Sequence, residues 1–124
     1  MKISQNPDAM APDGSEVRFL ARTDRGSMAQ FTLPVGKTSI AVAHRTVEEV
    51  WFFTQGQGQF WCKSAAGEEV MEIHPGVTLS ITVGTHFQFR NTGSEPLVAI
   101  ATTMPPWPGE NEAYKVEGKW VASL

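Results

Sequence analysis

The chain has a single cysteine, no excess of basic residues and no long apolar run, and each shortage excludes a class of protein. Cys62 alone cannot form an internal disulfide, and its position on an expected strand predicts a small buried hydrophobe rather than a nucleophile. The 10 lysine and arginine residues are outnumbered by 13 aspartate and glutamate residues, so the basic surface that nucleic acids require is missing. We therefore expect no nucleic-acid partner.

Long apolar segments and common catalytic signatures are missing as well. No run of about 20 apolar residues is present, so we expect no membrane partner. Residues 1–8 do not resemble a signal peptide, which predicts a cytoplasmic location. The sequence contains no nucleophile elbow, no glycine-rich phosphate loop before a helix, and no cysteine pairs spaced for zinc. We therefore set aside the three kinds of site that these motifs mark.

What the sequence does contain is a hydrophobic period of two, interrupted at short intervals by glycine, proline, asparagine and serine. Such alternation is typical of β-strands, and these residue types favour turns. Nine strands are expected, at Glu16–Leu20, Met28–Leu33, Thr38–His44, Glu49–Thr54, Gln57–Lys63, Glu68–Ile73, Thr78–Val83, His86–Arg90 and Leu97–Met104. That many short strands in 124 residues indicate one all-β domain, an antiparallel sandwich or barrel.

One segment carries a motif that extends over several of these strands. It reads Gly36-Lys-Thr-Ser-Ile-Ala-Val-Ala-His44-Arg-Thr-Val-Glu-Glu49-Val-Trp-Phe-Phe-Thr-Gln-Gly56. The segment resembles the first motif of the cupin family, which is a glycine, five residues, His-x-His, three or four residues, a glutamate, six residues and a glycine. His44 matches the second histidine and Glu49 matches the glutamate, while Val42 occupies the place of the first histidine.

A second segment, residues 82–91, resembles the second cupin motif, in which a glycine precedes a metal-binding histidine and then an asparagine. When the segment is aligned on Gly84 and Asn91, Phe87 stands in the place of that histidine and His86 comes one residue early. Each motif is weak by itself. Together, with matching internal spacings and a plausible separation, they carry the resemblance.

The resemblance covers about residues 28–104. It implies that the chain, 1–124, folds as a single double-stranded β-helix, or jelly-roll barrel, of the all-β class. The polar residues 1–15 are expected to form an N-terminal arm that is loosely held or lies on a neighbouring subunit. Cupins of this kind often form dimers through outer strand edges, so the resemblance also implies a homodimer.

The C-terminal tail, 105–124, is expected to leave the sheet, because its proline-rich start cannot pair within one. Its two tryptophans, Trp107 and Trp120, carry too much apolar area to remain in water. We expect both to pack over the outside of the barrel. In the alternative, Trp107 forms part of a rim over a pocket or part of a dimer interface.

Strand alternation decides which residues face the barrel interior. Successive residues point to opposite faces, and the resemblance implies that His44 and Glu49 point inward. On a later strand, His86, Gln88 and Arg90 are expected to point outward. The predicted ligand-binding wall consists of Val42, His44, Glu49, Trp51, Phe53, Phe87 and Phe89. A mainly apolar wall with a few polar groups is typical of a small-molecule site.

Cupin activity usually depends on a metal held by three histidines and the glutamate. Only His44 and Glu49 remain of that set here, and a stable divalent site generally needs at least three protein donors. The sequence therefore predicts no metal cofactor. In the alternative, a bulge near Gly84 swings His86 inward, so that His44, Glu49 and His86 hold iron, zinc, manganese or nickel.

Without a metal, two roles remain open for the two candidate catalytic residues, His44 and Glu49. They can act as general base and general acid, or they can simply hydrogen-bond each other. Our leading hypothesis is a barrel that binds an apolar or aromatic small molecule, a weakly acidic one among the possibilities, as a binding or sensing module. The alternatives are a metal-dependent oxygenase or isomerase, and a barrel filled solid with side chains.

Overall fold

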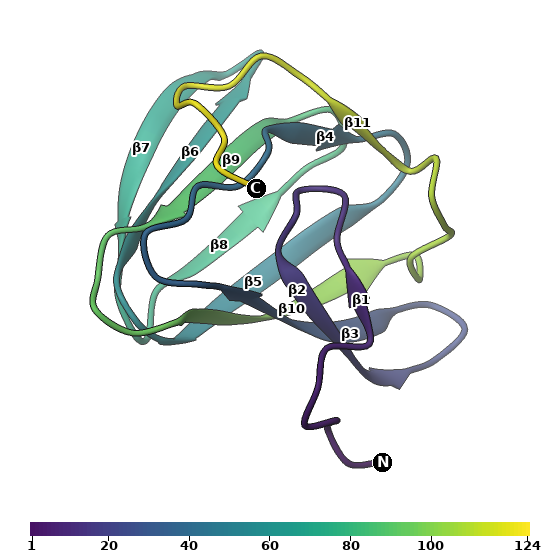
Figure 1. The fold of residues 1–124 in the computed structure, drawn as a ribbon. Coiled ribbons are helices and arrows are strands. Elements are labelled where there is room, and N and C mark those ends of the chain that lie inside the picture. The colour runs from purple at the N-terminus through teal and green to yellow at the C-terminus, as the bar shows by residue number, and fades with distance from the viewer.

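The computed structural model describes residues 1–124 as two antiparallel sheets that face each other across one core (Figure 1). Its strands are β1 (Ala9–Met10), β2 (Glu16–Arg22), β3 (Ser27–Leu33), β4 (Val42–His44), β5 (Glu48–Gln55), β6 (Gly58–Ser64), β7 (Gly67–Ile73), β8 (Thr78–Ile81), β9 (His86–Asn91), β10 (Leu97–Met104) and β11 (Ala113–Lys115). One sheet has the order β1-β2-β3-β10-β5-β8 and the other β11-β4-β9-β6-β7. The predicted all-β jelly roll is confirmed. None of the elements is a helix that could cross a membrane.

Strand β5 shows why the sequence folds in this way. Glu49, Trp51 and Phe53 are buried, whereas the residues between them face outward, as a period of two requires. The neighbouring strand β10 places Ala101 opposite Trp51 and Ala99 opposite Phe53. Small side chains beside large ones leave the aromatic rings room to fill the space between the sheets.

The core is dominated by aromatic rings at one end of the barrel. The ring of Phe60 stacks on those of Phe87 and Phe89, at centroid distances of 5.7 and 5.8 Å. The rings of Trp51 and Phe53 lie 5.7 and 6.5 Å from the Phe60 ring, in edge-to-face geometry. These rings therefore fill the space between the two sheets at this end of the barrel.

Residues shared with the two cupin motifs fix turns around this core. Gly56 has a φ of 89°, and a Cβ at this position would lie 2.6 Å from the carbonyl oxygen of Pro96, so no larger residue fits. The side-chain amide of Asn91 is buried and donates to the carbonyl oxygens of Leu33 and Glu95, at 3.0 and 2.9 Å. These contacts join turns that lie far apart in the sequence.

Strand Thr38–His44 is shorter than expected, because only Val42–His44 pairs as a strand. The backbone groups of residues 38–41 do not form a regular ladder with one neighbouring strand. Thr38 forms an isolated bridge, and the amide of Ile40 donates to the carbonyl oxygen of Asp13 at 2.8 Å. The N-terminal segment has thus taken the place of a regular strand partner.

Both ends of the chain are built into the barrel. The predicted arm, 1–15, contributes strand β1, which pairs with β2 and forms a hairpin whose tip reaches toward the segment before β4 (Figure 1). The prediction of a loosely held arm is therefore wrong for residues 8–15. The local sequence pattern does not predict this hairpin, because the hairpin depends on contacts with residues that are distant in the sequence.

The C-terminal tail is held by Gln88, for which strand alternation predicts an outward direction. Gln88 does face away from the barrel interior, but the tail buries it. Its side chain donates to the carbonyl oxygens of Ser39 and Trp120 and accepts from the backbone amides of Lys119 and Trp120. Trp120 packs over the outside of the barrel as predicted, with the Arg90 guanidinium 4.3 Å from its ring centroid.

Candidate functional site

A cavity of about 450 Å³ opens at the end of the barrel that the aromatic core leaves free. We call it the barrel cavity. Its walls come from the β1–β2 hairpin, strands β3, β4, β5, β9 and β10, and the C-terminal tail, and 14 of its 21 lining residues are hydrophobic. The volume lies within the range of small-molecule sites. The cavity contradicts the hypothesis of a barrel filled solid.

Most of the predicted wall lines this cavity. Its lining includes Val42, His44, Glu49, Trp51 and Phe87. Phe53 and Phe89 do not line it, and here the prediction is wrong. Both face inward, as alternation requires, but they lie farther along their strands and pack into the closed aromatic core.

His44 stands at the end of β4 with its imidazole ring between two other aromatic rings. The centroids of Phe87 and Trp107 each lie 5.3 Å away, in edge-to-face geometry. The residue is 4% exposed, and its Nδ1 makes no hydrogen bond, because the nearest Glu49 oxygen is 4.0 Å away. The expected hydrogen bond between His44 and Glu49 is therefore not formed.

Burial decides the charge of this imidazole. Removal from water lowers the pKa of His44, while the charges of Glu112 and Asp13 oppose the shift. The ring is consequently neutral at pH 7. His44 therefore lines the cavity as a neutral, buried ring whose Nδ1 has no hydrogen-bond partner.

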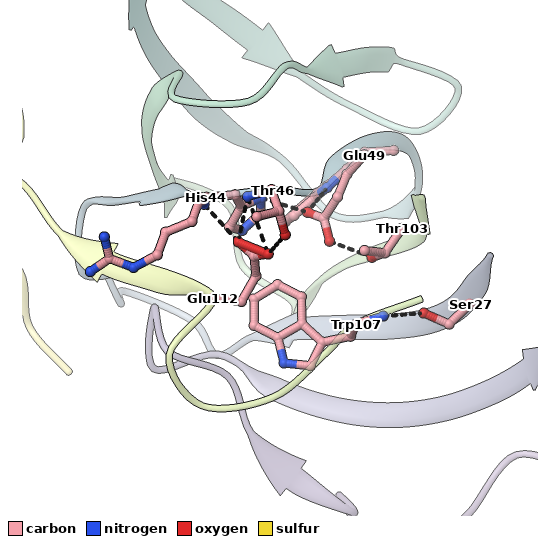
Figure 2. Close-up of polar contacts among 9 residues, drawn as sticks. Ser27, His44, Thr46, Glu49, Thr103, Trp107 and Glu112 are labelled. Atoms are coloured by element: carbon pink, nitrogen blue, oxygen red, sulfur yellow. Dashed lines mark hydrogen bonds and ion pairs between the residues drawn. The ribbon is translucent and has the colours of Figure 1, made fainter. Parts of the chain in front are cut away.

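Glu49 is held in place by two donors. The indole Nε1 of Trp51 donates to Oε1 at 3.1 Å, and the hydroxyl of Thr103 donates to Oε2 at 2.5 Å (Figure 2). Burial raises the pKa of the Glu49 carboxyl, and the two hydrogen bonds offset part of that rise. The two hydrogen bonds therefore fix the orientation of the Glu49 carboxyl at the wall of the cavity.

Asp13 is the site residue that the sequence analysis missed. It lies in the turn between β1 and β2, lines the cavity and is 4% exposed. Its Oδ1 accepts hydrogen bonds from the backbone amide and the hydroxyl of Ser15, at 2.9 and 2.6 Å. Burial raises the pKa of Asp13, with Ser15 opposing and the charge of Glu49 adding to the rise. The only available signal was the turn sequence Pro12-Asp-Gly, which was assigned to the arm.

Glu112 anchors the tail behind His44. It accepts hydrogen bonds from the backbone amides of Arg45 and Thr46 and from the Thr46 hydroxyl (Figure 2). Burial alone raises the pKa of Glu112, but these hydrogen bonds prevail and lower it below its usual value. An ionised carboxylate thus ties the segment before β11 to the connection between β4 and β5.

Trp107 reaches over the cavity from the same tail. Its backbone amide donates to the hydroxyl of Ser27 at 3.1 Å, and its ring lies against His44 (Figure 2). Trp107 therefore forms a rim over the cavity, as in the alternative considered for it, and does not pack on the outside of the barrel like Trp120.

The fit of a metal ion can be tested on the same residues. His86 precedes the inward-facing Phe87 on β9, lies opposite Lys63 of β6 and does not line the cavity. The bulge that would turn His86 toward Glu49 is not formed. No three histidine, cysteine, aspartate or glutamate side chains are arranged to hold a metal ion. The residues present therefore do not fit the ligand set of a metal-binding cupin.

Comparisons with known proteins agree with the fold described above. A family model described as "Cupin domain" matches residues 29–103, more than half of the chain. Among curated proteins, an uncharacterized protein of Methanocaldococcus jannaschii, MJ1618, is 28% identical over 104 residues, which are 80% of each chain.

Solved structures resemble the chain in fold. An uncharacterized protein with a double-stranded β-helix domain from Klebsiella pneumoniae covers 89% of this chain and 90% of its own length, with a TM-score of 0.69 and 14% identity. The capsular polysaccharide assembling protein CapF from Staphylococcus aureus has a TM-score of 0.72 and 20% identity over 95% of this chain. The match spans about a third, 32%, of the CapF chain.

Proposed function

The chain belongs to the cupin domain family, and from this premise we propose that it binds an apolar or aromatic small molecule inside its barrel, without a catalytic metal. The observation that carries the proposal is a cavity of about 450 Å³ with a mainly apolar wall and three buried ionisable groups, Asp13, His44 and Glu49. Sites for small molecules combine these features.

The unpartnered Nδ1 of His44 supports this proposal further. A buried nitrogen without a hydrogen bond destabilises the folded chain by about 1–3 kcal/mol. A ligand that bonds to this atom removes that cost and gains the apolar contacts of the surrounding wall. The edge-to-face rings of Phe87 and Trp107 leave the imidazole little freedom to turn toward another protein group.

A thermal-shift screen tests the proposal with panels of neutral, acidic and basic aromatic and aliphatic compounds. A compound at 100 times its Kd stabilises the folded state by about 2.7 kcal/mol, which raises Tm by several degrees in a domain of this size. The His44→Ala variant should lose part of this response, whereas His74→Ala, at an exposed turn, should keep it. The proposal fails if no compound raises the Tm of the native protein.

The sequence analysis left a metal-dependent oxygenase or isomerase open, with His44, Glu49 and His86 as the ligands, but His86 does not line the cavity with the other two. Elemental analysis of protein purified without chelators separates the two functions. We expect negligible iron, zinc, manganese and nickel in both native protein and the His44→Ala variant. Stoichiometric metal in the native protein that is lost in the variant would replace our proposal with the enzyme.

A further inference from the structure

The ionisable groups around the barrel cavity are mostly acidic. Two of its lining residues, Asp13 and Glu49, carry buried carboxyl groups, 4% and 3% exposed. The ionised carboxylate of Glu112 lies directly behind the His44 ring. Arg22 at the end of β2 is the basic lining residue, and it is exposed to solvent. The ionisable groups of the inner wall are therefore mainly acidic, and no buried lysine or arginine lies among the lining residues to balance them.

The polar groups of this wall mainly accept hydrogen bonds. Each oxygen of Glu49 accepts one hydrogen bond from the protein, and both donors of Ser15 bind the same oxygen, Oδ1, of Asp13. A carboxylate offers about four acceptor positions, so capacity remains on both residues. His44 is nine-tenths buried or more, and its Nδ1 has no partner. A ligand that donates several hydrogen bonds fits such a wall, and a carboxylate ligand does not.

The apolar part of the cavity also favours a cation with an aromatic body. The rings of Trp107, Phe87 and Trp51 line the cavity around His44, and a cation is attracted to aromatic faces. Met10 and Phe19 line the cavity but are 62% and 54% exposed, so its mouth is apolar. A ligand with a polar head and an apolar body would direct the head inward and the body toward this mouth.

Resting on the function proposed above, we propose that the barrel cavity selects a protonated amine with an aromatic or apolar body over the matching carboxylic acid. Asp13 and Glu49 bind the ammonium group, and Asp13 is the residue that determines this specificity. This choice of ligand replaces the weakly acidic ligand considered from the sequence. Two carboxyl groups repel an acid, or must take up protons before they accommodate one.

The test uses three indoles that differ only at the end of one side chain: tryptamine, tryptophol and indole-3-propionic acid. Isothermal titration calorimetry of the full chain at pH 7 measures their Kd values. We expect tryptamine to bind about 10-fold or more tightly than indole-3-propionate, with tryptophol between them, because one charge-assisted hydrogen bond is worth at least that factor. This order of affinities requires no variant.

Asp13→Asn then tests the role of Asp13. The asparagine oxygen can still accept both hydrogen bonds from Ser15, so the hairpin should keep its form. We expect tryptamine to bind about 3- to 10-fold more weakly to this variant, and tryptophol to bind within about twofold of native. Asp24→Asn, at an exposed loop position with the same charge change, should alter neither affinity by more than about twofold.

The outcomes separate this inference from the function on which it rests. If tryptophol binds and the acid binds as tightly as the amine, amine selection is wrong and small-molecule binding stands. If Asp13→Asn and Asp24→Asn weaken tryptamine equally, Asp13 is not the specificity residue. If none of the three indoles binds, the proposed selection of an amine with an aromatic body is wrong, and the thermal-shift panel then decides whether the cavity binds small molecules of another kind.

Discussion

Replacing Trp107 by alanine should weaken ligand binding strongly and lower stability only in part, because this ring forms the rim of the cavity and little of the core. Trp107 is half-buried and held by one backbone hydrogen bond to Ser27 and one edge-to-face contact with His44. A fully buried tryptophan costs about 3–5 kcal/mol when it is truncated. Because Trp107 is only half-buried, we expect Trp107→Ala to lower the free energy of unfolding by about half as much, about 2 kcal/mol.

The effect of this change on affinity follows from the contact that the ring makes with a ligand. Loss of about 50 Å² of apolar contact costs about 1.2 kcal/mol, at about 25 cal/mol per Å². Loss of an aromatic pair adds about 0.5–1.5 kcal/mol. The sum is about 2 kcal/mol, which corresponds to a Kd about 30-fold weaker for a neutral aromatic probe such as tryptophol.

Trp120 provides the matched control. It is the other half-buried tryptophan of the tail, and its ring contacts the Arg90 guanidinium outside the barrel. Trp120→Ala should lower stability by a similar amount and leave the Kd of tryptophol within about twofold of native. Titration calorimetry and thermal denaturation of both variants test this reasoning. It would be refuted if Trp107→Ala bound tryptophol like the native protein, or if Trp120→Ala weakened binding as much.

Two further predictions concern pH and assembly. Because burial raises the pKa of Glu49 in the folded chain, the stability that this carboxyl contributes is present below its unfolded value, 4.5, and is lost as the pH rises through the folded pKa. The Tm of Glu49→Gln relative to native should therefore increase as the pH rises above 4.5, by about 3–6 °C for each kcal/mol that the native protein loses. A difference that stays constant with pH would contradict this. The homodimer remains a prediction: Val50 and Phe52 are both 48% exposed on the outer face of β5, where a second copy could cover them. Light scattering at micromolar concentration should give twice the chain mass for native protein and less for Phe52→Ser, whereas a strictly monomeric native chain would count against a dimer.

The sequence predicted the barrel and much of one wall of its cavity. Alternation placed Glu49 with Trp51 on one face of its strand and His44 with Val42 on one face of theirs, and the resemblance to cupins identified these faces as the interior. These inferences succeed because the face of a strand residue depends on its immediate neighbours in the chain. The glycine and asparagine positions of the motifs likewise report local turn geometry.

Only the tertiary structure decided how deep each inward residue lies and what the chain ends contribute. Alternation assigns Phe89 and Phe87 to the same face, but their depth depends on how the two sheets pack, and Phe89 belongs to the closed core. Asp13 and Trp107 come from segments without hydrophobic periodicity. Their positions depend on hydrogen bonds to Ile40 and Ser27, 27 and 80 residues away in the sequence. No local pattern encodes such contacts, because they form only when the whole barrel has brought its ends together.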